Sequence, residues 1–161
     1  MTRACILISL ALWAATAAVA DMRLAAGGET DYVIVVDPEA TVAEKHAAEE
    51  LASFLGQVTG AQFPVIELAQ APDRPALIVG PGRPARAVAP DLSYDDLHPD
   101  GIIIETRGDR LILAGDRPRG TLYAVYTFLE DTVGCRWWSS KASTIPSRPD
   151  LTVPDQHVRY V

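Results

Sequence analysis

The sequence predicts a domain of the α+β class, a two-layer α/β sandwich in which a mixed, largely antiparallel sheet carries two main helices on one face. Short runs of β-branched and aliphatic residues recur along the chain, and only two longer segments have helical periodicity. One pair of runs flanks a tight turn, which is typical of a β-hairpin. Two helices are too few to cover both faces of so wide a sheet, so we expect them side by side.

The composition fits one globular domain. Apolar residues make up 48% of the 161 residues and charged residues 22%, which argues against disorder as the main state. The 14 Lys and Arg are outnumbered by 21 Asp and Glu, which gives a net charge of −7, so we expect no nucleic-acid partner. Two cysteines cannot build a disulfide framework. Beyond the first segment, no apolar run reaches the roughly 20 residues that a transmembrane helix needs.

Residues 1–20 have the layout of a secretory signal peptide: a basic start with Arg3, an apolar run over 4–14 and an Ala-x-Ala triplet that ends at Ala20. The alternative is a buried hydrophobic helix of the folded domain. Cleavage after Ala20 would leave a single cysteine, Cys135. We expect an exported protein, periplasmic or extracellular, with no membrane attachment after cleavage.

The first half of the mature chain predicts three strands and one helix. Residues 32–36 are apolar and β-branched, as in a buried strand. Thr41 is a good N-cap for the helix that follows, Glu44 completes a capping box, and Gly60 ends the helix. One face of this helix is apolar: Ala48, Leu51, Ala52, Leu55 and Val58. Two further strands are predicted at 63–68 and 76–80.

The second half contains the clearest local signal, a hairpin about Gly108. A second helix follows, because Pro118 suits a first helical turn and Gly134 supplies a stop. The elements predicted here are, in order, a loop over 81–99 with at most a short helical turn at 85–88, hairpin strands at 101–106 and 110–114, the second helix, and strand-like segments at 135–138 and 151–153.

The second helix carries no charge between Leu122 and Leu129. Its expected core stripe is Leu122, Val125, Tyr126, Leu129 and Val133. An edge helix normally exposes charge on its other side, whereas a helix covered on two sides does not. We therefore expect another domain to dock on this helix, through Tyr123, Ala124, Thr127 and Phe128. The alternative is a helix with a few exposed apolar residues, which is common.

Two tryptophans follow this helix directly. Trp137 and Trp138 are neighbours in a predicted strand, so at least one should point outward. An outward ring would either extend the apolar docking patch or, beside Arg136, stack on a sugar. Carbohydrate binding by Arg136, Trp137 and Trp138 is therefore a hypothesis for this segment.

No catalytic residue, metal site or cofactor is predicted. A short acidic group lacks the spacing of a calcium loop and is interpreted as a solvated loop: Asp95, Asp96, His98 and Asp100. The histidines are too scattered for a zinc signature: His46, His98 and His157. The glycines around Pro81 are interpreted as a turn, because proline lacks the N–H that a phosphate loop uses. Cys135 is interpreted as a buried apolar residue rather than a nucleophile.

Five blocks occur in an order that resembles a known domain: Asp100–Ile104, Leu111–Gly115, Arg119–Tyr126, Phe128–Glu130 and Gly134–Trp138. With the first helix, they resemble the N-terminal domain of family 67 alpha-glucuronidases over residues 32–158. The resemblance is closer to the equivalent domain of large secreted bacterial proteins related to those enzymes. The second domain of family 20 beta-hexosaminidases is similar too.

The resemblance implies an architecture and a division of labour. In that family the two helices lie between the sheet and a following (β/α)8 barrel, and the catalytic carboxylates lie on the barrel. None of those carboxylates corresponds to a residue of this chain. The resemblance also implies architectural roles for two residues: Gly120 would permit tight packing, and Arg119 would form a structural ion pair.

The favoured hypothesis is a non-catalytic accessory domain of an exported bacterial, alpha-glucuronidase-like glycoside hydrolase. The domain would span residues 21–158, and residues 159–161 would begin a linker to a (β/α)8 barrel missing from this chain. The barrel would be the partner in cis or in trans, with a polysaccharide as a further partner. The alternative is a free-standing carbohydrate-binding module that uses Trp137 and Trp138. An independent small hydrolase is a third, weaker hypothesis, because no acid/base pair supports it.

Overall fold

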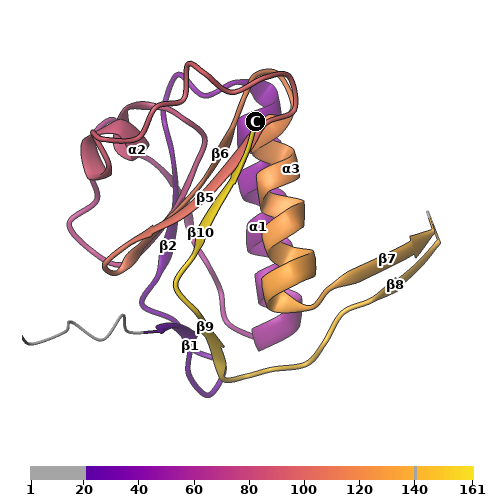
Figure 1. Cartoon of the computed structure of the whole chain (residues 1–161). Coiled ribbons are helices and arrows are strands. Elements are labelled where there is room, and N and C mark those ends of the chain that lie inside the picture. Colours follow the sequence, from indigo (N-terminus) through magenta and orange to yellow (C-terminus); the bar gives the residue numbers. More distant parts are fainter. Residues whose placement is uncertain (1–20, 140) are drawn as a thin grey trace, which may run out of the picture.

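The computed structural model describes residues 21–139 and 141–161 (Figure 1). The predicted signal peptide, residues 1–20, lies outside the described residues. The elements are β1 Met22–Ala25, β2 Val33–Val36, α1 Val42–Thr59, β3 Val65–Glu67, β4 Ala76–Val79, α2 Arg83–Val88, β5 Ile102–Arg107, β6 Arg110–Gly115, α3 Gly120–Thr127, the π-helix η1 Phe128–Val133, β7 Arg136–Ser139, β8 Ala142–Thr144, β9 Leu151–Val153 and β10 His157–Tyr160.

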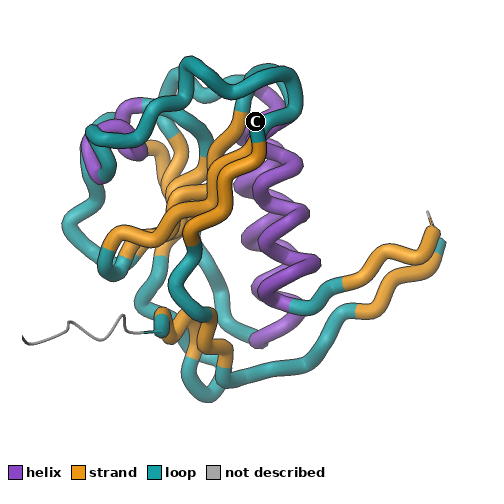
Figure 2. Tube along the Cα trace, viewed as in Figure 1, coloured by secondary structure: helices purple, strands orange, loops and turns teal. Residues whose placement is uncertain are grey.

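A six-stranded mixed sheet forms the centre, in the order β10-β5-β6-β4-β2-β3. Strands β6, β4, β2 and β3 run parallel, while β5 and β10 are antiparallel to their neighbours. Helices α1 and α3 lie side by side on one face, and the short α2 lies on the other (Figure 2). The predicted α+β sandwich with two main helices on one face is confirmed. Within the central sheet three pairings are parallel and two are antiparallel. Antiparallel pairings become the majority in the described chain when the β1–β9 and β7–β8 pairs are added.

The alternation of side chains along the strands produces two cores. Ile34 and Val36 of β2 face α1 and α3, whereas Val33 and Val35 of the same strand face α2 and its loop. Because both faces of the central strands are buried, these strands are apolar throughout rather than alternating. The larger core lies under the helix pair and receives the small β1–β9 sheet at one end.

Helix α1 begins and ends as the sequence predicts. The hydroxyl of Thr41 accepts the N–H of Glu44 at 3.2 Å, and the Glu44 carboxylate accepts the N–H of Thr41 at 2.8 Å. This reciprocal pair satisfies backbone donors that the first helical turn leaves unbonded. At the other end Gly60 has φ +80°, and its N–H bonds to the carbonyl of Gly56 at 2.8 Å.

Helix α3 starts at a contact that only glycine permits. A Cβ on Gly120 would lie 2.5 Å from the carbonyl oxygen of Gly101, and one on Gly115 would lie 2.3 Å from the carbonyl carbon of Gly120. The start of β5, the end of β6 and the first turn of α3 therefore touch backbone to backbone. The expected tight packing at Gly120 is confirmed, and so is the ion pair of Arg119, whose guanidinium donates to both carboxylate oxygens of Asp100 at 3.1 and 2.9 Å.

Several parts of the chain differ from the predictions, and strands β1 and β8 were not predicted. The predicted strand at 135–138 forms β7, but within the described residues it pairs with β8 in a separate hairpin instead of joining the central sheet. The predicted domain end at Val158 is too early, because β10 continues to Tyr160 at the edge of the sheet. This strand was not predicted because polar residues alternate with apolar ones along it, as is typical of an edge strand, so it contains no apolar run. No helix in the described residues is long and apolar enough to cross a membrane.

Candidate functional site

The outer face of the helix pair keeps two of the four predicted docking residues. Tyr123 is 40% exposed, and Thr127 is half-buried. Ala124 and Phe128 are fully buried in the larger core, so their assignment to the docking surface was wrong. The reason is that α3 packs against both α1 and the sheet, which buries a wide arc of the helix. The uncharged run from Leu122 to Leu129 is therefore explained in large part within the domain.

An aromatic cluster of Phe54, Tyr126 and Trp137 joins α1, α3 and β7 on this outer side. The rings of Phe54 and Tyr126 meet the Trp137 ring edge to face, with centroids at 5.0 and 4.9 Å. The Tyr126 hydroxyl donates to the Glu50 carboxylate at 2.6 Å. Burial and that carboxylate raise the pKa of Tyr126 to about 12, so the phenol stays neutral. Phe54 was missed because it lies beside the apolar stripe of α1 rather than on it.

The predicted carbohydrate-binding residues do not form one platform. Trp138 is 69% exposed, whereas Trp137 is half-buried in the aromatic cluster, because neighbouring strand residues point to opposite sides. The guanidinium of Arg136 donates to the backbone carbonyls of Cys135, at 2.7 Å, and Glu130. Arg136 thus satisfies carbonyls at the end of η1. Of the two tryptophan rings, only that of Trp138 is exposed. Its indole N–H donates to the Thr144 hydroxyl at 3.0 Å.

A polar cavity of about 430 Å³ opens at the carboxyl ends of the parallel strands β2, β4 and β6. Asp37 follows β2 and is almost fully buried; it accepts bonds from the Arg83 guanidinium at 2.6 and 2.9 Å and from two backbone N–H groups. These bonds hold the pKa of Asp37 well below its usual range and raise that of Arg83. A Cβ on Gly82 would lie 2.7 Å from the Cβ of Asp37, so the glycine makes room for the pair.

The second ion pair at this end is Arg117 with Glu44. The Arg117 guanidinium donates to the buried Glu44 carboxylate at 2.9 and 3.3 Å, and this contact raises the pKa of Arg117. One Glu44 side chain therefore caps α1 and ties the end of β6 to it. Ligands of open α/β sheets often bind at strand carboxyl ends. Here both buried carboxylates are bonded to arginine and backbone donors, and the lowered pKa of Asp37 disfavours its action as a general acid.

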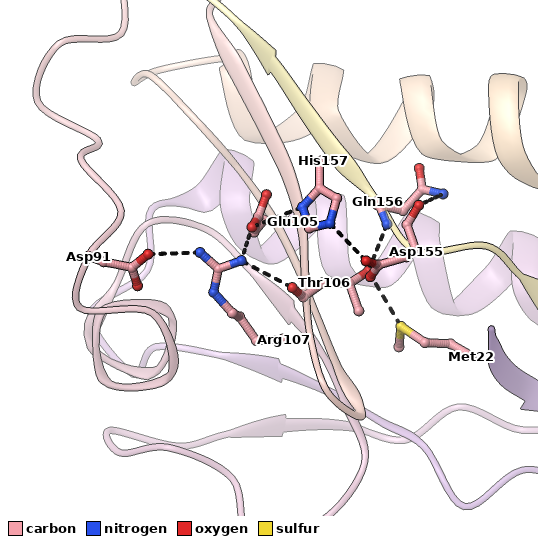
Figure 3. Close-up of polar contacts among 8 residues, drawn as sticks. All are labelled: Met22, Asp91, Glu105, Thr106, Arg107, Asp155, Gln156 and His157. Atoms are coloured by element: carbon pink, nitrogen blue, oxygen red, sulfur yellow. Dashed lines mark hydrogen bonds and ion pairs between the residues drawn. The ribbon is translucent and has the colours of Figure 1, made fainter. Parts of the chain in front are cut away.

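A chain of polar contacts fastens β10 to β5 at the sheet edge (Figure 3). The His157 ring contacts Glu105 through Nδ1 at 3.1 Å and Asp155 through Nε2 at 2.7 Å. Arg107 bonds to Glu105 and, at 2.9 Å, to Asp91 of the preceding loop. The carboxylates of Glu105 and Asp155 contact different nitrogens of the His157 ring, so the three side chains do not converge on a common site. The described residues hold no group of three or more His, Cys, Asp or Glu side chains arranged to bind a metal ion.

The acidic loop before β5 is held by arginines. Asp95 contacts Arg86 at 3.3 Å, and Asp96 contacts Arg159 of β10 at 2.5 Å. With the Arg119–Asp100 pair, each aspartate has its own arginine from a different element. The predicted loop is therefore solvated and is also tied by ion pairs to neighbouring elements.

Cys135 is buried as predicted, and burial raises the pKa of its thiol, which disfavours the nucleophilic thiolate.

Comparison with known proteins identifies the family. Residues 17–128 match the family model described as glycosyl hydrolase family 67 N-terminus. No curated protein sequence matches the chain.

Among solved structures, the chain is similar to a family GH115 4-O-methyl-alpha-glucuronidase, BtGH115A, described as specific for decorated arabinogalactans, with 16% identity and a TM-score of 0.59. The match covers 81% of this chain but only 17% of that one, so the chain spans a small part of the enzyme's length. A second structure, CpGH84D, is 15% identical over 84% of this chain and 21% of its own, with a TM-score of 0.49. Because the family model covers more than half of the chain, the chain belongs to the glycosyl hydrolase family 67 N-terminus family.

Proposed function

We propose that this chain is the non-catalytic accessory domain of an exported bacterial alpha-glucuronidase-like enzyme. The domain packs the outer face of α1 and α3 against a (β/α)8 catalytic barrel, in cis or in trans. The barrel cleaves an alpha-linked glucuronic acid from a polysaccharide by paired-carboxylate hydrolysis. The predicted signal peptide over residues 1–20 directs export to the periplasm or beyond.

The observation that carries the proposal is the aromatic outer face of the helix pair in a family of N-terminal domains. Tyr123 of α3 is 40% exposed, and the half-buried rings of Phe54, Tyr126 and Trp137 form a cluster across α1, α3 and β7. Large aromatic rings at a surface are typical of a face that another protein surface covers.

The described polar groups support a non-catalytic role. A general acid in a glycosidase needs a carboxyl group whose pKa is raised toward neutrality. Asp37, the buried carboxylate of the strand-end cavity, has a lowered pKa instead. Glu44 is held by the α1 cap and by Arg117. These groups stabilise the fold and leave the chemistry to the barrel.

Antibody depletion and a direct assay test the proposal. An antibody raised against residues 21–161 should remove alpha-glucuronidase activity from the exported proteins of the source bacterium. Purified residues 21–161 should release no uronic acid from a glucuronic-acid-substituted polysaccharide. Hydrolysis by the purified domain, or full activity left after depletion, would contradict the proposal.

The exposed ring of Trp138 favours one second candidate, a free-standing carbohydrate-binding module. An indole 69% exposed on a projecting hairpin is accessible to a sugar ring. Sugar stacking should shift the tryptophan fluorescence of residues 21–161 on titration with soluble oligosaccharides, and the shift should vanish in Trp138→Ala. An unchanged signal across neutral and uronic-acid-containing oligosaccharides would exclude this candidate.

A further inference from the structure

We propose that the β7–β8 hairpin is an arm that grips the catalytic domain, with the Trp138 indole as its anchor. The inference rests on the proposed function, because it assumes a domain docked on the outer face of α1 and α3. It adds a second contact, on an element that leaves the body of the domain.

Beyond its base at Arg136 and Trp137, the hairpin does not pack on the domain that carries it. Every described residue of β7 and β8 except Trp137 is exposed, and within the described chain the two strands pair only with each other. Figures 1 and 2 show it projecting away from the end of the helix pair, on the side opposite the sheet. An isolated two-stranded hairpin is at best marginally stable in water. A partner surface would supply the packing that the hairpin lacks.

The base of the arm is nevertheless fixed. Trp137 is wedged between Phe54 of α1 and Tyr126 of α3, and Arg136 bonds to the backbone at the end of η1. At the exposed end the Trp138 indole is held across the hairpin by the Thr144 hydroxyl at 3.0 Å. A ring that is already oriented loses less entropy when it is buried in a partner.

The route of the chain indicates which partner lies within reach. The backbone at Tyr160 lies beside Gly101, which in turn touches Gly120 at the start of α3. The arm begins after Gly134, at the far end of α3 and η1, about 20 Å away along the helix axis. Anything that follows Val161 therefore leaves at one end of α3 while the arm stands at the other (Figure 1).

Exposed aromatic rings occur along this same line. In the described part of the chain, the tyrosine and tryptophan side chains that are at least 40% exposed are Tyr160, Tyr123 and Trp138, at the exit, on the helix face and on the arm. Tyrosine and tryptophan anchors supply much of the binding energy of protein interfaces. Since this family is described as the N-terminus of glycosyl hydrolases, the partner that would meet all three rings is the catalytic domain of the proposed function, in cis or in trans.

Hydroxyl-radical footprinting of the native exported protein tests the arm. The protein is captured with the antibody against residues 21–161, and oxidation of each ring is compared by peptide mass spectrometry with that in purified residues 21–161. We expect oxidation of both Tyr123 and Trp138 to be about fivefold slower in the native protein, because interface anchors are shielded from water. Ile66, on the far edge strand β3, should react equally in both samples.

The outcomes separate the arm from the docking face. Protection of Tyr123 without protection of Trp138 would overturn the arm and leave the proposed function standing. Protection of neither ring would overturn both. Protection of Trp138 in the purified domain by added glucuronoxylan oligosaccharide, with none in the sugar-free native protein, would replace the arm by a sugar site. In the native protein, Trp138→Ala should also lower the melting temperature, whereas the exposed control Ile66→Ala should not.

Discussion

The two ends of helix α3 have opposite character. At its start three glycines bring strand and helix backbones into contact, and the neighbouring charges are matched by Asp100–Arg119 and Glu44–Arg117 pairs. At its far end a hairpin projects, with an exposed tryptophan. The first region is held by backbone contacts and ion pairs within this chain, whereas the second leaves the Trp138 ring in water. The difference indicates that the start of α3 stabilises the fold, whereas the hairpin at the far end is available to contact another protein surface.

The largest effect should come from closing the glycine contact. Gly115→Ala places a Cβ 2.3 Å from the backbone of Gly120, and backbone cannot move aside as a flexible side chain can. We expect a loss of about 3 kcal/mol or more in the free energy of unfolding, measured by urea denaturation. Gly56→Ala is the matched control, since its Cβ would meet the nearest atom at 3.4 Å within a helix, and it should be neutral or stabilising. If the two substitutions changed the free energy of unfolding equally, the close backbone contact at Gly115 would not be the cause of the destabilisation.

Removing the buried charge at the strand ends should have the next largest effect. Asp37→Asn weakens the bonds to Arg83, and we expect a loss of about 2 kcal/mol in the free energy of unfolding at pH 7. Because the pKa of Asp37 is lowered by folding, its contribution is complete above its unfolded pKa of about 4 and is lost as the pH falls further.

The stability difference between wild type and Asp37→Asn should therefore shrink below about pH 4. Urea titrations at several pH values measure it. Asp95→Asn is the control, because that carboxylate is largely exposed in its pair with Arg86 and should make no measurable contribution. A difference that stays constant down to pH 2 would contradict the account of Asp37.

A smaller loss should follow from removing the cap of α1. Thr41→Ala deletes the acceptor for the Glu44 N–H, and we expect about 1 kcal/mol of destabilisation by thermal denaturation. Thr41→Ser keeps the hydroxyl and should recover most of that stability. If serine were as destabilising as alanine, the hydroxyl bond would not be the cause.

The smallest effect on stability should come from the exposed rings. Tyr123→Ser with Trp138→Ser removes two exposed side chains, and we expect the free energy of unfolding to change by no more than about 0.5 kcal/mol. The same double variant should reduce self-association of residues 21–161, measured by sedimentation, because it removes the apolar patch. A large loss of stability would show that these rings serve the domain itself.

Local signals in the sequence predicted most of the fold. The Thr41 cap, the Gly60 stop and the hairpin about Gly108 depend on neighbours in the chain, and all three are confirmed. Strand β10 was missed because an edge strand exposes alternate residues, such as His157 and Arg159, and need not be apolar.

The docking surface was predicted only in part, for a physical reason. Periodicity shows that Ala124 and Phe128 lie off one apolar stripe, but it does not show that α1 covers them within the same domain. The His157 contacts with Glu105 and Asp155 likewise depend on the pairing of β10 with β5, which no local pattern specifies. Both the burial of these two side chains and the contacts of His157 are therefore set by tertiary packing.

The mass of the native exported polypeptide tests the central claim most directly. Capture with an antibody against residues 21–161, followed by denaturing electrophoresis and intact mass measurement, distinguishes two outcomes. The account predicts a polypeptide much larger than this chain, or this chain in a stable complex with a separate catalytic domain. A monomer with the mass of residues 21–161 would contradict it, and the exposed Trp138 would then be tested first as a sugar-binding residue.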